Sequence, residues 1–287
     1  MRLPRTKRDD VRVIPASRGG KAVGVGGLGG IIVGILALLG VFAGGGFDYN
    51  SPFDAFPQAP QGSARSGVPG APDAADETVE FLRFVTGDIN DFWAGRFGQA
   101  GGGTTYRPAV VNVFDGSAQT GCGAASSAVG PFYCPADEQV YLDLDFFREL
   151  TDRFRAPGDF AQAYVVAHEI GHHVQNITGI TDQVARATAA DQGQGNQLSV
   201  RTELQADCLA GVWGHSTYER GLLESGDLEE GLAAAAAVGD DRIQSETTGQ
   251  IRPETWTHGS SQQRSDWFLR GFKSGDPESC DTFSADL

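Results

Sequence analysis

Residues 163–175 read AYVVAHEIGHHVQ and contain the pattern His-Glu-Ile-Gly-His at positions 168–172. Apolar residues recur around this pattern at helical spacing, so we expect a helix from position 159 to about 176. On a helix, residues four apart share one face, so the two imidazoles can reach one metal ion while Glu169 lies beside the open position of that ion. The stretch therefore predicts a catalytic metal site on a helix.

The two histidines need a third partner. A catalytic zinc ion takes three protein ligands and keeps a fourth position for water, so His168 and His172 do not complete the site. Some zinc peptidases carry a third histidine six residues further on, but this position is Thr178. The neighbouring His173 projects about 100° away around a helix and should not bind the same ion.

The candidate for the third ligand is Glu203 in the stretch ELQAD, on a helix that we expect from about 199 to 214. Glu203 and Asp207 lie four residues apart and share one helix face. Glu203 can therefore bind the metal while Asp207 accepts a hydrogen bond from a liganding histidine. Helical spacing alone leaves a second interpretation open, an acidic helix face exposed to solvent.

The remaining patterns predict more helix than strand. Ser260 with Gln263 forms a capping box that opens a last helix, which should end near Lys273. The other expected elements are helices at 77–97 and 228–238 and strands at 110–114 and 139–144. The fold class that we predict is mainly α, an α+β domain with a few short strands.

The composition changes before this domain. Residues 1–21 carry seven basic and two acidic groups, whereas the rest of the chain carries 15 basic and 35 acidic groups, a net charge of −20. This charge repels phosphate backbones, so we expect no nucleic-acid partner. Residues 22–47 carry no charge and could cross a ~30 Å hydrocarbon core once. Residues 48–75 have the Pro/Gly-rich composition of a flexible linker, which leaves 76–287 for the folded domain.

The apolar segment admits three interpretations. The long basic stretch ahead of it favours an uncleaved transmembrane signal anchor in the cell membrane, with a basic cytoplasmic tail and an extracytoplasmic domain. Residues 31–43 alone would suit the apolar core of a cleaved signal peptide. A buried glycine-rich helix of a soluble protein is the third interpretation, which the poor helix propensity of glycine disfavours.

All four cysteines lie in the expected domain. An even number of cysteines beyond a membrane predicts two disulfides. We favour Cys122 with Cys134, which closes a short glycine-rich loop, and Cys208 with Cys280, which ties the C-terminal tail to an internal helix. The alternative is a structural zinc site built from all four, although the chain has no C-x-x-C spacing.

Several stretches resemble one family of enzymes. Besides residues 163–175, these are GPFYCP at 130–135, ELQADC at 203–208, GDDR at 239–242 and THGSSQQR at 257–264 followed by Trp267 and Phe268. Together they resemble the bacterial putative neutral zinc metallopeptidase family over about 77–283. Members of this family have a basic N-terminal segment and one membrane anchor. The resemblance implies a zincin-like peptidase domain that acts on a peptide or protein substrate.

The resemblance also implies the site residues. The stretch ELQAD is similar to the glutamate-containing helix of the gluzincin peptidases, which implies Zn2+ held by His168, His172 and Glu203. Zinc lowers the pKa of a water to about 7 and polarises the carbonyl of the bond to be cleaved. Glu169 is then expected to take the proton of that water as general base and to pass it to the leaving amine.

The oxyanion of such a reaction needs a second electrophile. His258, just before the last helix, is the candidate, with Tyr218 and Tyr141 as weaker ones. The alternative for His258 is a capping role at that helix. We expect residues 240–242, Asp-Asp-Arg, to form a structural salt-bridge cluster and His215 to lie at the surface.

Three functions follow from these observations. The first is a membrane-anchored zinc-dependent endopeptidase, and the second is another metal-dependent amide hydrolase, for instance one that trims cell-wall peptides. The third is a non-catalytic zinc protein that serves as a membrane-tethered binding module. An intact Glu169 argues against the third, because a binding module needs no general base.

Overall fold

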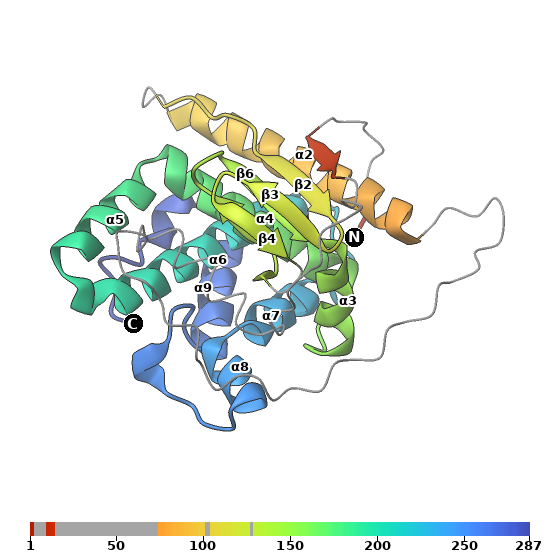
Figure 1. The fold of residues 1–287 in the computed structure, drawn as a ribbon. Helices are drawn as coiled ribbons and strands as arrows, with labels where there is room; N and C mark the ends of the chain where they lie inside the picture. The colour runs from red at the N-terminus through yellow and green to blue at the C-terminus, as the bar shows by residue number, and fades with distance from the viewer. Residues whose placement is uncertain (3–9, 15–73, 101–103, 127–128) are drawn as a thin grey trace.

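The computed structural model describes residues 1–2, 10–14, 74–100, 104–126 and 129–287. A small sheet lies on one side of the molecule and most helices pack beneath it (Figure 1). The helices are α2 (Ala74–Ala100), α3 (Leu144–Asp152), α4 (Asp159–Ile177), α5 (Ile180–Ala190), α6 (Gly195–Glu219), α7 (Asp227–Ala237), α8 (Asp240–Thr247) and α9 (Ser261–Ser274). Short 3-10 turns are η2 (Gln192–Gln194), η3 (Pro253–Thr255) and η4 (Pro277–Cys280). The predicted mainly helical α+β class is confirmed.

The strands are β1 (Val11–Val13), β2 (Val110–Phe114), β3 (Ser117–Thr120), β4 (Gly123–Ser126), β5 (Phe132–Cys134) and β6 (Gln139–Asp143). Four of them form a sheet in the order β1-β2-β6-β5, in which β2 pairs in parallel with both β1 and β6 and β5 runs antiparallel to β6. Strands β3 and β4 form a separate antiparallel hairpin. The described part of the sheet thus ends at β5, which contacts helix α4.

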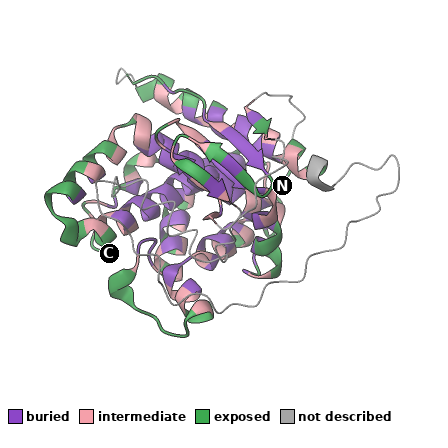
Figure 2. Ribbon diagram, in the orientation of Figure 1, coloured by how far each residue is buried: buried purple, intermediate pink, exposed green. Residues whose placement is uncertain are grey.

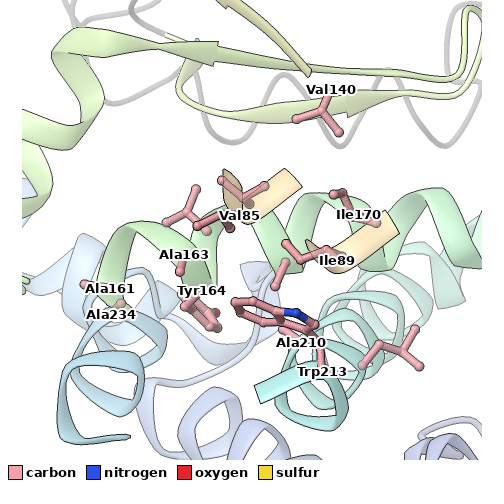
Figure 3. Packing of buried hydrophobic residues seen from close by; sticks show 14 of the residues in the cluster. Val85, Ile89, Val140, Ala161, Ala163, Tyr164, Ile170, Ala210, Trp213 and Ala234 are labelled. Atoms are coloured by element: carbon pink, nitrogen blue, oxygen red, sulfur yellow. The ribbon is translucent and has the colours of Figure 1, made fainter. Parts of the chain in front are cut away.

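Helix α4 lies at the centre of the domain. Every residue from Ala163 to Gln175 is buried, because the sheet covers one side and α6 covers the other (Figure 2). Val140 of the sheet lies above Ile170 of α4, and Trp213 of α6 lies below it (Figure 3). A helix that is buried all around cannot be amphipathic, which explains why the motif has so few polar neighbours.

Two glycines let the central helices approach closely. A Cβ atom at Gly171 would lie 3.1 Å from the backbone oxygen of Ala206, so only a small residue lets α4 meet α6 here. A Cβ atom at Gly211 would overlap the backbone of Phe268, so α6 and α9 also pack nearly backbone to backbone. These contacts bring the motif helix, the ELQAD helix and the last helix together.

The predicted elements are mostly confirmed, with boundaries that differ. Both predicted strands form, and α9 begins with the predicted capping box of Ser260 and Gln263. Helix α6 is longer than predicted at both ends. The helices α3, α5 and α8, the β3-β4 hairpin and the strand β5 were not predicted.

The sequence analysis also did not place any tail residue on the domain. Strand β1 pairs with β2, and the backbone N–H of Arg2 donates to the carbonyl of Leu222 at 2.7 Å. The predicted anchor at 22–47 and nearly all of the linker lie outside the described residues. No helix within the described ranges is long and apolar enough to span a membrane. A single crossing with the tail in the cytoplasm would separate β1 from β2, so the predicted orientation and this strand pairing exclude each other.

Both favoured disulfides are confirmed. Cys122 bonds to Cys134 and ties the turn between β3 and β4 to the edge strand β5. Cys208 bonds to Cys280 and ties α6 to η4 near the C-terminus. The four-cysteine zinc site is therefore wrong.

Candidate metal and catalytic site

The three predicted ligands meet where α4 crosses α6. The Nε2 atom of His168 lies 3.2 Å from one carboxylate oxygen of Glu203, and the Nε2 atom of His172 lies 3.2 Å from the other. Each residue offers one ligand atom within 4.8 Å of the other two, and all three side chains are buried. Two imidazole nitrogens and a carboxylate oxygen are a donor set that suits zinc, so the residues fit the predicted ion.

The charge of this cluster favours a cation. Burial opposes ionisation of Glu203, but His172 and His168 outweigh it and hold the pKa of Glu203 well below its ordinary value. Glu203 is therefore an anionic donor at neutral pH, with only 2% of its surface exposed. A buried carboxylate that faces two imidazole nitrogens is costly unless a cation or protons compensate it.

Asp207 supports His168 as predicted. The Nδ1 atom of His168 lies 2.8 Å from Asp207 Oδ1, and since a carboxylate can only accept, this nitrogen carries the hydrogen. The hydroxyl of Tyr164 donates to the same oxygen at 2.5 Å. Arg264 donates to Asp207 through Nε at 2.8 Å and through Nη2 at 2.9 Å. These bonds turn the Nε2 atom of His168 toward Glu203.

The sequence analysis assigned no role to Arg264. Its side chain is buried on α9, and together with His168 it holds the pKa of Asp207 below the ordinary value although burial opposes this. The residue lies in the stretch THGSSQQR, which carried part of the family resemblance. Apart from this stretch, nothing in the helix distinguished it, because Arg270 and Lys273 are further cations on α9.

Glu169 lies beside the ligand cluster on the same helix. The carboxylate is buried, and its Oε2 atom has no hydrogen-bond partner among the described residues. Burial raises the pKa of Glu169 above its ordinary value. A buried carboxylate without a partner is costly and needs an explanation, and a catalytic role is one of the few that apply.

His258 lines the same cavity as the ligand cluster. Its Nδ1 atom lies 3.0 Å from Asp240 Oδ1, while its Nε2 atom is buried without a partner among the described residues. The second oxygen of Asp240 accepts from the backbone N–H groups of Thr257, His258 and Gly259. Asp240 thus holds both the loop and the imidazole, and Ser260, not His258, caps the last helix.

The predicted salt-bridge cluster at 240–242 is wrong. Asp240 binds His258, while Asp241 accepts from the backbone and hydroxyl of Ser261. Arg242 forms its ion pair with Glu246, one turn further along α8. Three consecutive residues of a helix point in different directions. Their neighbouring positions in the sequence therefore did not predict ion pairs among them.

The other sequence candidates lie elsewhere. Tyr218 is largely exposed, and the hydroxyl of Tyr141 donates to Asp137 outside the cavity. His173 contacts Tyr133 and the carbonyl of Arg107, so it does not join the ligand cluster, as predicted. His215 contacts the carbonyl of Phe272 and is partly exposed.

The cavity is lined by both polar and apolar residues. The polar ones include His168, Glu169, His172, Glu203 and His258. The apolar ones include Pro131 just before β5, Phe132 of β5, Phe146 of α3, Val165 of α4 and Val238 just after α7. A small set of convergent polar groups beside apolar surface is typical of a site for a small organic group or a peptide segment.

A helical domain with a buried His-His-Glu cluster and an adjacent free glutamate belongs to the class of H-E-x-x-H metal-site proteins. Residues 6–283 match the family described as Putative neutral zinc metallopeptidase, and the chain belongs to this family. The family suspected from the sequence stretches is thereby confirmed. Membership indicates a zinc peptidase.

Proteins of several bacteria are similar to this chain over about two thirds of its length or more. Protein YpfJ of Escherichia coli K12 is 50% identical over 209 residues, which cover 72% of each chain. Protein Mb2605 of Mycobacterium bovis is 52% identical over 191 residues, which cover 63% of this chain and 64% of the relative, and Rv2575 of Mycobacterium tuberculosis H37Rv gives the same values. All three are named as uncharacterised proteins. No solved structure matches the chain.

Proposed function

We propose that the protein is a zinc-dependent metallopeptidase that hydrolyses peptide bonds with Glu169 as general base. The observation that carries this proposal is the buried and unpartnered Oε2 atom of Glu169 beside three residues that can hold zinc. A protein that only binds zinc has no use for this costly group. The proposal is therefore favoured over a non-catalytic binding module.

The residues of the site have two roles in peptide hydrolysis, metal binding and proton transfer. His168, His172 and Glu203 would hold zinc, which supplies a Lewis acid for the peptide carbonyl and lowers the pKa of a water. Glu169 accepts a proton from the attacking water at its free oxygen and returns it to the nitrogen of the leaving amine. The raised pKa of Glu169 favours the first of these two transfers, because the protonated carboxyl is less costly than the carboxylate in a buried site.

His258 stabilises the negative charge that develops on the carbonyl oxygen. Since Asp240 can only accept, the imidazole donates its Nδ1 hydrogen to it in either protonation state. His258 lines the cavity, and its Nε2 atom, which is buried without a partner among the described residues, donates to the oxyanion when it carries a hydrogen.

Two substitutions separate catalysis from metal binding. Glu169→Gln keeps the size of the side chain and removes the proton acceptor, so zinc should stay bound while hydrolysis of a peptide library falls by roughly 10² to 10⁴. Glu203→Ala should lose zinc itself, because two histidines leave the ion under-coordinated. Elemental analysis and mass spectrometry of the digests measure the two effects.

Glu219→Ala provides the matched control, since Glu219 lies on the same helix but is exposed and distant from the ligand cluster. It should keep both zinc and activity. If Glu169→Gln cleaves the same peptides at the parental rate, the proposed general base is wrong. If the parental protein binds zinc but cleaves nothing in a broad library, a binding module becomes the better account.

A further inference from the structure

The second metal-facing histidine has a neutral partner. The Nδ1 atom of His172 lies 2.8 Å from Oε1 of Gln175, which follows three positions later on α4. Residues three apart are neighbours on a helix surface, so the amide reaches the imidazole without distortion. Gln175 is fully buried, and its amide must satisfy all of its hydrogen bonds inside the protein.

The surroundings of Gln175 determine which end of its amide faces His172. The Nε2 atom donates to the backbone carbonyl of Thr202 at 2.7 Å and to Oε1 of Gln205 at 3.0 Å. A carbonyl can only accept, so the nitrogen must lie on this side and the oxygen must face the imidazole. The oxygen in turn requires a hydrogen on Nδ1 of His172. The lone pair of Nε2, 3.2 Å from Glu203, is then available to a metal.

The direction of the next amide is set in the same way. Nε2 of Gln205 donates to the backbone carbonyl of Cys280 at 3.0 Å, which leaves Oε1 of Gln205 to accept from Gln175. Cys280 is held in place by its disulfide with Cys208, on the same helix as Gln205. The hydroxyl of Thr282 donates to the carbonyl of Arg201, which also lies on α6. The C-terminal segment is thus tied to α6 on both sides of the amide contact.

We propose that Gln175 is a positioning residue for His172, and that the carbonyls of Thr202 and Cys280 select through it the His172 nitrogen that is offered to zinc. The chain of bonds runs from Cys280 through Gln205 and Gln175 to the imidazole. This inference rests on the zinc site of the proposed function. It adds that the C-terminal segment takes part in that site although it contains no ligand.

The main test compares zinc affinity in two variants. Gln175→Leu has a similar size but offers no acceptor to His172, so zinc should bind 10- to 100-fold more weakly in competition with a chelator. Asn90→Leu is the matched control, because Asn90 is a buried amide on α2 that bonds to Tyr106 and Ala109 outside the cavity. It should lower the melting temperature as well but change the zinc affinity by less than about twofold.

Gln205→Leu tests the remote step. It breaks the link to Cys280 but leaves the bond from Gln175 to Thr202, so the loss of zinc affinity should be smaller than for Gln175→Leu. An unchanged affinity in Gln175→Leu would overturn the proposal. An equal loss in Asn90→Leu would also overturn it, because the effect would then report general destabilisation.

A second measurement needs no variant and no bound metal. Nitrogen NMR of the zinc-free parental protein at a pH where His172 is neutral should show the hydrogen of His172 on Nδ1. A hydrogen on Nε2 would contradict the inference even if the protein is an active zinc peptidase. If the parental protein does not bind zinc at all, the proposed function fails, whereas the tautomer of His172 still decides on the positioning role.

Discussion

His168 and His172 lie one turn apart on α4 and face the same glutamate, yet their supports differ in charge. The support of His168 is an anion, Asp207, which Arg264 neutralises. The support of His172 is a neutral amide, Gln175. Both supports leave the Nε2 atom of their histidine toward Glu203.

The two supports are vulnerable to different changes. A carboxylate accepts at either oxygen, so Asp207 needs no help to select the tautomer of His168, but its buried charge needs Arg264. An amide carries no such desolvation cost, but its donor and acceptor ends can exchange unless other groups orient it. The charged support should therefore dominate stability, while the neutral support should depend on remote backbone carbonyls.

The largest effect on stability is expected from Arg264→Leu. It leaves the buried charge of Asp207 without its partner, so the free energy of unfolding should fall by about 3–5 kcal/mol in urea titrations of the zinc-free protein. Arg107→Leu is the control, because Arg107 pairs with Glu138 at the surface, where both side chains are more than a third exposed, and the loss should be about 1 kcal/mol or less. Equal losses in the two variants would show that the charged support has no special role.

A smaller effect is expected from Asp240→Asn, which changes the support of His258, the third histidine that lines the cavity. The carboxylate accepts charge-assisted bonds from His258 and from the backbone, so its loss should cost about 1.5–3 kcal/mol at neutral pH. Burial opposes the charge of Asp240, but the bonds from His258 and Thr257 lower its pKa below the ordinary value.

The sign of this pKa shift sets the pH dependence. An aspartate with a lowered pKa in the folded protein stabilises it above about pH 4 and loses this contribution as the pH falls through the folded pKa. The difference between the parental protein and Asp240→Asn should therefore stay constant above about pH 4 and narrow at lower pH. Denaturant titrations at several pH values measure it, and a difference that grows toward acid pH would contradict the assignment.

The smallest effect is expected from Tyr164→Phe. This variant removes one hydrogen bond to Asp207 and leaves both bonds from Arg264 in place. The free energy of unfolding should fall by about 1 kcal/mol, and zinc affinity should change little. If Tyr164→Phe weakens zinc binding as strongly as Gln175→Leu, the charged support is not the more robust of the two.

Local sequence patterns predicted some helices and strands of the fold and missed others. Helix α9 was predicted from its capping box and β6 from the alternation of its residues, because these signals lie within each segment. Strand β1 was missed because only its pairing with β2, about a hundred residues away, makes it a strand. Helix α8 is short and polar, so it carried no apolar period that could reveal it.

The histidine pair and Glu169 follow from the sequence, since the pitch of one helix sets their mutual geometry regardless of the rest of the fold. The same helical pitch places Glu203 and Asp207 on one face of α6. It does not determine which other helix packs against that face. The close contact of Gly171 with Ala206 settles this in three dimensions.

Several hydrogen bonds of the site join residues that lie far apart along the chain. They are the bonds of Arg264 to Asp207, of His258 to Asp240 and of Gln205 to the carbonyl of Cys280. The periodicity of the sequence does not predict these hydrogen bonds, because bonds between distant segments depend on how whole helices pack against one another.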